Sequence, residues 1–190
     1  MKPRKPKNCK MCGDEFTPLR PFQHVCGGKC AIAFVRKNEA EKKAKERADK
    51  LKIRRRNARP LSHWIALTQR AVNDLRRETC LASGDGCISC GTHNASSWHA
   101  GHFRTTASAS HLRFTHDNIW LQCSTCNVYK SGNIGRYRRN LVRKIGEERV
   151  LALENDNRTH RWTVEELEQI RKQARADLRV LKKGQMSKVA

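Results

Sequence analysis

The sequence predicts a small zinc-stabilised α+β protein, built from short metal-bound units that are joined by helices. Eight of the nine cysteines fall into four close pairs, and long helical patterns separate these pairs. Only 37% of the 190 residues are hydrophobic and 6% are aromatic. Such a composition supports several small cores better than one large core, and small cores are commonly stabilised by metal or disulfides.

The paired cysteines form two sets of four, each with C-x2-C spacing in at least one of its pairs. They are Cys9, Cys12, Cys26 and Cys30, and Cys87, Cys90, Cys123 and Cys126. This spacing suits tetrahedral zinc, so we predict two structural Zn2+ sites. A disulfide framework is the alternative, but two-residue spacing suits a metal better and the total number of cysteines is odd. The ninth cysteine, Cys80, is expected to be a buried small residue.

Residues 1–32 are predicted to form an N-terminal zinc-binding unit. Cys9 to Gly13 has the pattern of a zinc knuckle, in which glycine supplies the positive φ of the turn. The apolar run Ala31 to Val35 follows Cys30, so the last ligand should lie in the first turn of a helix, as in a treble clef. Phe16, Phe22 and Val25 are the candidates for the core of this unit.

Residues 33–83 are predicted to form a basic helical arm and a second helix. The arm, ending near residue 58, is rich in Ala, Glu, Lys and Arg and is polar nearly all round. Such a helix is solvated, part of a coiled coil, or laid along a polyanion. Pro60 should end it, and Ser62 is the expected N-cap of the second helix, whose apolar face has helical spacing.

Residues 84–154 contain the second cysteine set, and residues 155–190 are predicted to form a C-terminal helix and tail. A second knuckle at Cys87 to Gly91 precedes two short strands, one near Trp98 to Phe103 and one leading to Cys123. A helix should open near Ser124 and be short or interrupted, because Gly132 and Gly135 follow. Thr163 to Glu166 is a capping box before a helix that we expect to run to Lys182, with a frayed tail from Gly184.

The charge of the chain indicates a polyanionic partner. Lys and Arg number 40 against 18 Asp and Glu, a formal net charge of +22, and residues 1–60 alone carry 19 basic against 6 acidic residues. Nucleic acid is the default partner of such a chain, and an anionic membrane surface is the alternative. No apolar run approaches the roughly 20 residues needed to span a bilayer, and no signal peptide follows Met1, so we expect an intracellular protein without membrane partners.

The second cysteine set encloses more polar residues than a structural zinc site requires. Several histidines, an aspartate and an asparagine lie between its two pairs, and Asn127 follows Cys126 directly. Bound zinc would bring the hairpin around His102 close to the helix around Asn127. Imidazole, amide and carboxylate groups there could bind a hard divalent ion while a neutral histidine takes a proton from water. The alternative is that these histidines are ordinary exposed polar groups or spare ligands.

These residues resemble a known nuclease pattern. Cys87-x2-Cys90, then Gly101-His102-Phe103, then Asp117-Asn118 through Cys123-x2-Cys126-Asn127-x2-Lys130 is similar to the HNH, or ββα-metal, nuclease motif with its stapling zinc. The resemblance implies that His102 is the general base, Asn118 fixes the loop, Asn127 binds the catalytic ion and Lys130 lies near the phosphate. Asparagine at position 127 resembles phage endonuclease VII, a junction-resolving enzyme.

The sequence departs from the motif at Gly101, where relatives commonly carry an Asp or His metal ligand. His99, His116 or Asp117 could substitute, and the ion expected from the resemblance is Mg2+ or Mn2+ with His99, Asp117 and Asn127 as its tentative ligands. The sequence alone does not decide among them.

Nearly the whole chain also resembles the lambdoid phage NinG (Rap) family of recombination endonucleases. The segments that carry this resemblance include Ala100 to Thr105, Leu112 to Phe114 and the run Lys130 to Val150. The resemblance implies metal-dependent cleavage of branched DNA, such as D-loops and Holliday junctions, in the cytoplasm of an infected bacterial host. It also implies partners among host or phage recombination proteins. A symmetric junction favours a homodimer with two active sites, although the sequence does not specify the oligomeric state.

Several basic residues are candidates for DNA binding near this centre, with an ordinary solvated surface as the alternative. They are Arg104, Arg113, Arg136, Arg138, Arg139, Arg143 and Lys144. A non-enzymatic zinc-finger nucleic-acid-binding protein is the second hypothesis for the whole chain, and an adaptor with a coiled-coil arm is the third. The set of His102, Asn118 and Asn127 favours the enzyme, because a protein that only binds does not need these residues between its knuckles.

Overall fold

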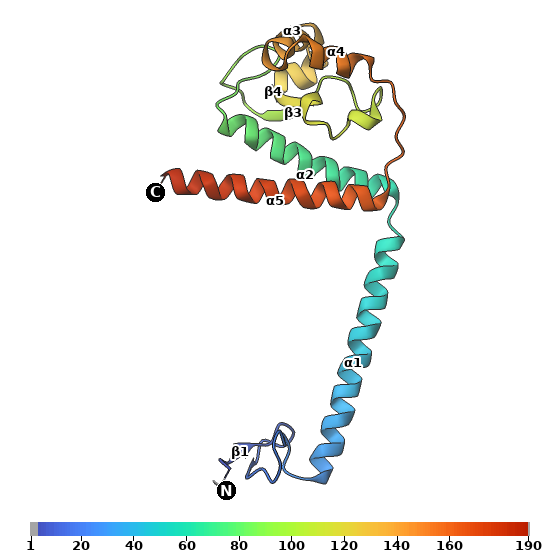
Figure 1. Cartoon of the computed structure of the whole chain (residues 1–190), viewed down its shortest axis with the longest axis vertical. Coiled ribbons are helices and arrows are strands. Elements are labelled where there is room, and N and C mark those ends of the chain that lie inside the picture. The colour runs from blue at the N-terminus through green and yellow to red at the C-terminus, as the bar shows by residue number, and fades with distance from the viewer. Residues whose placement is uncertain (1–3, 190) are drawn as a thin grey trace. The chain divides into compact units, whose positions relative to one another are not determined.

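The computed structural model describes residues 4–189, which form two compact units (Figure 1). The first unit ends at Arg59 and the second begins at Pro60. The sequence divided the chain into 1–32, 33–83, 84–154 and 155–190. The compact units group these segments in two, since the helices on either side of 84–154 both belong to the second unit.

The first unit is a two-stranded hairpin followed by one long helix. Strands β1 (Lys7–Asn8) and β2 (Glu15–Phe16) pair antiparallel around the first knuckle, and helix α1 spans Gly28–Asn57. Cys30 lies in the first turn of α1, as predicted. The core is smaller than expected, since Val25 is buried but Phe22 is 88% exposed. Phe22 has a φ of +61° in a tight turn, and this turn directs it away from the small interior.

Helix α1 has the bounds that the sequence predicts and buries none of its residues. Its last turn carries three arginines, Arg54, Arg55 and Arg56, which complement the negative end of the helix dipole. Its helical state therefore depends on residue propensity and charge rather than on packing within its unit.

The second unit is layered around a short β-hairpin, with helix α2 (Leu61–Ala82) on one face and helix α3 (Ile134–Ile145) on the other. Helix α5 (Val164–Val189) runs parallel to α2 and packs against its other side (Figure 1). Helix α2 begins after Pro60, which has the extended backbone of an N-cap. The prediction of Ser62 as the N-cap is wrong, because proline already ends the preceding segment and Ser62 lies inside the first turn.

Strands β3 (Trp98–His102) and β4 (Ile119–Cys123) pair antiparallel, with His102 opposite Ile119 and Gly101 opposite Trp120. Side chains alternate between the two faces of such a pair. Ala100 and Ile119 accordingly contact the α2 side, whereas Phe103 and Trp120 contact the α3 side. This alternation places the His102 side chain on the α2 face.

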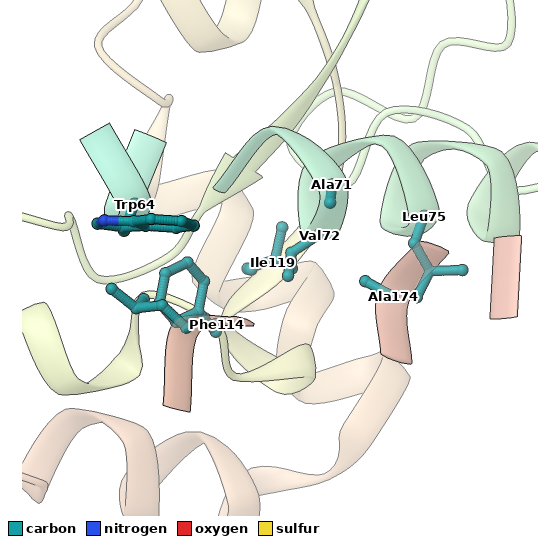
Figure 2. Packing of buried hydrophobic residues seen from close by; sticks show 8 residues of the cluster. Trp64, Ala71, Val72, Leu75, Phe114, Ile119 and Ala174 are labelled. Carbon is teal, nitrogen blue, oxygen red and sulfur yellow. The ribbon is translucent and has the colours of Figure 1, made fainter. Parts of the chain in front are cut away.

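The core between α2, α5 and the hairpin contains both aliphatic and aromatic side chains. Figure 2 shows Trp64, Val72 and Leu75 from α2 close to Phe114, to Ile119 of β4 and to Ala174 of α5. Trp64 is 4% exposed and Ile119 is fully buried. This core fixes β4, and through β4 the end of β3, against α2.

A second core lies on the opposite face of the hairpin. Tyr137 and Leu141 of α3 are fully buried there, together with Val150 and Leu153 of helix α4 (Glu147–Asn155). The long β3–β4 connection contains two short 3₁₀ turns, η1 (Ser110–Leu112) and η2 (His116–Asn118). Tyr137 also donates a hydrogen bond of 3.0 Å from its hydroxyl to the carbonyl of Gly101.

The helix that the sequence places after Cys123 is only a five-residue π-helical turn, η3 (Thr125–Tyr129). Three consecutive residues with positive φ, Ser131, Gly132 and Asn133, separate it from α3. The prediction of an interrupted helix is thus confirmed. The interruption redirects the chain so that α3 can pack on the hairpin.

Helix α5 begins at the predicted capping box. Glu166 Oε2 accepts a hydrogen bond from the Thr163 backbone at 2.8 Å, and Thr163 Oγ1 accepts one from the Glu166 backbone at 3.2 Å. The helix continues to Val189, so its predicted end at Lys182 is wrong. Gly184 costs helix stability but leaves the backbone hydrogen bonds of the helix intact, so a single glycine does not have to end it.

Candidate functional site

Both cysteine sets converge into metal-sized clusters. Within each set, the four sulfur atoms lie within 4.8 Å of one another. Cys12 and Cys26 are 3.6 Å apart, and Cys90 and Cys123 are 3.8 Å apart. A tetrahedral Zn–S4 site with bonds of about 2.3 Å has sulfur–sulfur edges of about 3.8 Å, whereas a disulfide needs about 2.05 Å. The two sets therefore fit zinc and not disulfides.

The two knuckles share one backbone geometry. The backbone amide of the first cysteine donates a hydrogen bond to the carbonyl five residues later. Cys9 donates to Asp14 and Cys87 donates to Thr92, both at 2.8 Å. A glycine with positive φ, Gly13 or Gly91, then donates back to the first cysteine's carbonyl. This turn presents two sulfurs to one point. The third ligand precedes a helical segment, as Cys26 before α1 and Cys123 at the end of β4, and the fourth lies at the start of that segment, as Cys30 in α1 and Cys126 in η3.

Amide groups near the sulfurs favour the thiolate form that a metal requires. The Cys26 amide donates to Cys9 Sγ at 3.4 Å, and the Asn133 side chain donates to Cys126 Sγ at 3.6 Å. Backbone N–H groups, first that of Cys12, lower the pKa of Cys9 to about 6, although desolvation opposes this effect. The donor set thus fits zinc in both sites.

Cys80 is buried in α2, as predicted, and is 1% exposed. Burial raises the pKa of its thiol, so the thiol stays protonated and unreactive.

His102, the predicted general base, is held in one orientation at the end of β3. Its Nε2 lies 3.0 Å from the carbonyl oxygen of Arg113 and 3.4 Å from Nε2 of Gln69 in α2. A carbonyl oxygen only accepts hydrogen bonds, so Nε2 carries the proton. Desolvation by burial lowers the pKa of His102 below its usual value. The neutral ring therefore keeps its lone pair on Nδ1, the atom that can accept a proton.

Asn118 ties together the two ends of the loop that follows His102. Its Oδ1 accepts a bond of 2.7 Å from the Arg104 amide, and its Nδ2 donates to the carbonyls of Arg104 at 3.0 Å and Leu112 at 3.1 Å. The residue is fully buried. These three bonds are the contacts that a loop-fixing residue must make, and they place the Arg113 carbonyl against His102.

Replacing Asn118 with alanine should lower the free energy of unfolding of the zinc-loaded protein by about 2–4 kcal/mol. The substitution leaves a buried N–H and two buried carbonyls without partners, and each lost partner costs about 1–3 kcal/mol before relaxation. Urea unfolding followed by circular dichroism measures this loss. The exposed Asn155→Ala is the matched control and should change stability by less than about 0.5 kcal/mol. An unchanged Asn118→Ala protein would contradict the loop-fixing assignment.

The side chain of Gln122 occupies the space beside Gly101, where the nuclease motif commonly has an Asp or His. A Cβ atom on Gly101 would lie 1.8 Å from Gln122 Oε1, so only glycine fits there without moving Gln122. The Gln122 Nε2 donates to Ser89 Oγ and to the Gly132 carbonyl, both at 2.6 Å. Its Oε1 is buried without a hydrogen-bond partner. A neutral amide thus replaces the usual ligand.

Two of the three tentative ligands of a catalytic ion have other partners. The Asp117 carboxylate pairs with Arg149 at 2.9 Å, and His99 Nε2 contacts Ser97 Oγ at 3.4 Å. By strand alternation His99 lies on the face opposite to His102. Among residues 4–189, only the two cysteine sets bring together three or more His, Cys, Asp or Glu ligands. Asp117, the carboxylate among the tentative ligands, is thus paired with Arg149 and is not free to bind Mg2+ or Mn2+, ions that are usually held by one or two carboxylates.

Arg113 provides a cation beside His102. Its Nη1 donates to Gln69 Oε1 at 3.3 Å and its Nη2 to the Thr106 carbonyl at 3.4 Å. Gln69 therefore contacts both His102 and Arg113. Sequence reasoning missed Gln69, because the apolar pattern of α2 gives no sign that one polar residue faces the site. It also missed Gln122, which lies on the opposite face of the strand pair and fills the space beside Gly101. Lys130 is exposed and ends η3.

The other basic candidates differ in how free their charges are. Arg104 donates to the carbonyls of Leu153, Glu154 and Asp156 and thereby caps the end of α4. Arg138 pairs with Glu147 and Glu154, and Lys144 pairs with Asp85. These three bind the protein itself, which disfavours their predicted role in DNA binding. By contrast Arg136, Arg139 and Arg143 are exposed, share one face of α3 and form no ion pair within residues 4–189.

Comparison with known proteins places the chain among bacteriophage sequences. A family described as "Bacteriophage Lambda NinG protein" matches residues 1–185. Protein ninG of Escherichia phage lambda is 38% identical over 192 residues, which is 93% of each chain. Protein ninG of Salmonella phage P22 and that of Escherichia phage 933W are each 39% identical and cover 93% of this chain and 94% of their own. No solved structure shows a significant match.

Proposed function

The chain belongs to the NinG family of bacteriophage proteins, and from this premise we propose that it is an endonuclease that cleaves branched DNA during phage recombination, in the cytoplasm of the infected host. The observation that carries the proposal is the state of His102. This residue is neutral, is fixed by the Arg113 carbonyl at 3.0 Å, and has its lone pair on Nδ1. A protein that only binds DNA gains nothing from a histidine held in this state.

In the proposed reaction, His102 Nδ1 takes a proton from a water molecule. The water oxygen forms a bond to phosphorus as the bond from phosphorus to the 3′ oxygen breaks, and the 3′ oxygen gains a proton from solvent. The Arg113 guanidinium, which donates to Gln69 Oε1 beside His102, stabilises the negative charge on the phosphate. Zinc held by Cys87, Cys90, Cys123 and Cys126 would fix the end of β4 and would take no part in the reaction.

The divalent ion that the nuclease resemblance implies plays no part in this scheme, because the described side chains do not assemble its ligands. A phosphate and water would have to supply most of its coordination. The proposal therefore rests on His102 and Arg113, and the dependence on added metal is a question for experiment.

A non-enzymatic zinc protein that binds nucleic acid is the second candidate function. Two observations favour it: the Asp117 carboxylate is paired with Arg149, and the neutral amide of Gln122 lies beside Gly101. Both observations remove the acidic ligand that a metal-dependent nuclease ordinarily uses. The same basic surface would serve this function equally well.

Incubating the purified zinc-loaded protein with a labelled four-way junction and a matched linear duplex distinguishes the two functions. We expect cleavage of the junction and little of the duplex, and parallel reactions with Mg2+, with Mn2+ and with neither show whether a further ion is required. Tight junction binding without cleavage under all three conditions would establish the binding function instead.

A further inference from the structure

Helix α5 carries a continuous basic face that lies outside the candidate site. Between Gln169 and Gln185 it has one acidic residue, Asp177, and six basic residues, Arg171, Lys172, Arg175, Arg179, Lys182 and Lys183. At 100° per residue, all six basic residues fall within an arc of about 120°, which extends along about 18 Å of the helix. We call these six residues the α5 basic face.

The α5 basic face points away from the packed side of the helix. Leu167 and Ala174 are buried against α2, and Ile170 and Leu178 pack on the same core. These apolar residues occupy an arc next to the basic one and do not overlap it. The packed side therefore fixes the rotation of the helix and the direction in which the basic face points.

At least three of the six charges on this face are exposed and available to a ligand. Lys172, Arg175 and Arg179 are exposed and form no ion pair within residues 4–189. The Arg171 guanidinium lies over the Trp64 ring, 5.5 Å from its centroid, an arrangement that leaves its charge unneutralised. Asp177 bonds the side chain of Gln173, which lies outside the basic arc.

Two ordinary explanations of a basic helix do not account for this one. Cations near a helix C-terminus complement the helix dipole, but this effect is confined to the last turn, and Arg171 and Arg175 lie mid-helix. A solvated face usually mixes both signs, as α1 does with four acidic residues among its bases. From Arg171 to Lys183 the arc holds cations alone, and Glu168 lies at its N-terminal edge. Repulsion among these six neighbouring cations costs stability unless a polyanion binds there.

We propose that the α5 basic face binds the phosphate backbone of one duplex arm of the DNA substrate. Its length of about 18 Å corresponds to about five base pairs at 3.4 Å each. The inference rests on the function proposed above for the identity of the ligand as DNA, and it adds a binding surface on an element that carries none of the predicted site residues.

The test is the salt dependence of junction binding. The variant Lys172→Gln, Arg175→Gln, Arg179→Gln removes three charges from exposed positions. If each contacts a phosphate, the slope of log K against log salt becomes less steep by about 2.7. For binding curves that converge near 1 M salt, this change corresponds to about a hundredfold weaker binding at 0.15 M. An unchanged slope would overturn the proposal.

A charge-matched variant distinguishes the effect of the α5 basic face on junction binding from the effect of net charge. It carries the same three substitutions together with Gln169→Arg, Gln173→Arg and Val180→Lys, all at exposed positions outside the basic arc. We expect this variant to bind as weakly as the triple variant, and recovery of wild-type binding would show that only net charge matters. Thermal unfolding of each variant checks the fold.

Binding and cleavage are scored separately, so the two proposals fail in different ways. If the triple variant has the wild-type salt slope and the wild-type protein cleaves the junction, the α5 basic face is rejected and the nuclease proposal stands. Absence of cleavage with the expected change in slope would reject the nuclease and leave the surface.

Discussion

His102→Ala should reduce junction cleavage by about 10²- to 10⁴-fold while junction affinity stays within twofold of the wild type. The substitution removes the Nδ1 lone pair that takes the proton, and loss of a general base has this order of effect. The net charge of the protein does not change, because the wild-type imidazole is neutral. Single-turnover cleavage and equilibrium binding under one salt condition measure the two quantities.

His99→Ala is the matched control, because His99 lies on the same strand with its side chain on the opposite face. It should cleave at nearly the wild-type rate. Cleavage by His102→Ala at the wild-type rate would show that His102 is not the base. Equal losses in both variants would point to damage of the hairpin instead.

The pH dependence of cleavage follows from the same pKa shift. The base is active when neutral, and burial lowers its pKa, so the rate should fall on acidification with a midpoint below the usual value of about 6.5. Stability changes in the same direction. The unfolded chain binds the proton first, so His102 lowers the stability of the fold as the pH falls from about 6.5 toward its folded pKa.

Removing one zinc should disorder the segment that this zinc holds and leave the other compact unit intact. Each structural site contributes about 10–16 kcal/mol of apparent folding free energy, against a net stability of about 5–15 kcal/mol for a domain. Cys126→Ser should therefore abolish the cooperative unfolding of the second unit, and Cys12→Ser should disorder the β1–β2 hairpin only. Metal analysis should give two zinc ions per wild-type chain and one in each variant.

Cys80→Ala serves as the control for cysteine loss. Its thiol is buried in α2 and belongs to neither set of ligands, so this variant should keep two zinc ions and lose only packing energy. If Cys126→Ser retained two zinc ions and unfolded like the wild type, the second zinc site would be ruled out.

The sequence predicted those elements whose cause is local. Cysteine spacing predicted the knuckles, the capping box at Thr163 predicted the start of α5, and alanine-rich charged sequence predicted α1 almost to the residue. In each case the determining residues are neighbours in the chain, so their geometry follows from their spacing.

Long-range contacts set what the sequence could not predict. Nothing near Arg104 indicates that it caps α4, about fifty residues later in the chain. Likewise, the partner of Asp117 comes from α4, and the side chain beside Gly101 comes from the paired strand. The charge of a residue can be read from the sequence. Whether that charge is already paired within the protein depends on which distant segment packs beside it.

The absence of buried side chains along α1 has a consequence for how this protein can diverge. A helix that packs on nothing within its unit is constrained only by helix propensity and by the sum of its charges. Beyond its first turns, which carry the ligand Cys30 and the His24 contact of Phe34, its residues can therefore exchange positions or types during evolution with little penalty to folding. We expect selection to act on this segment through its composition, whereas in the second unit it acts on individual residues.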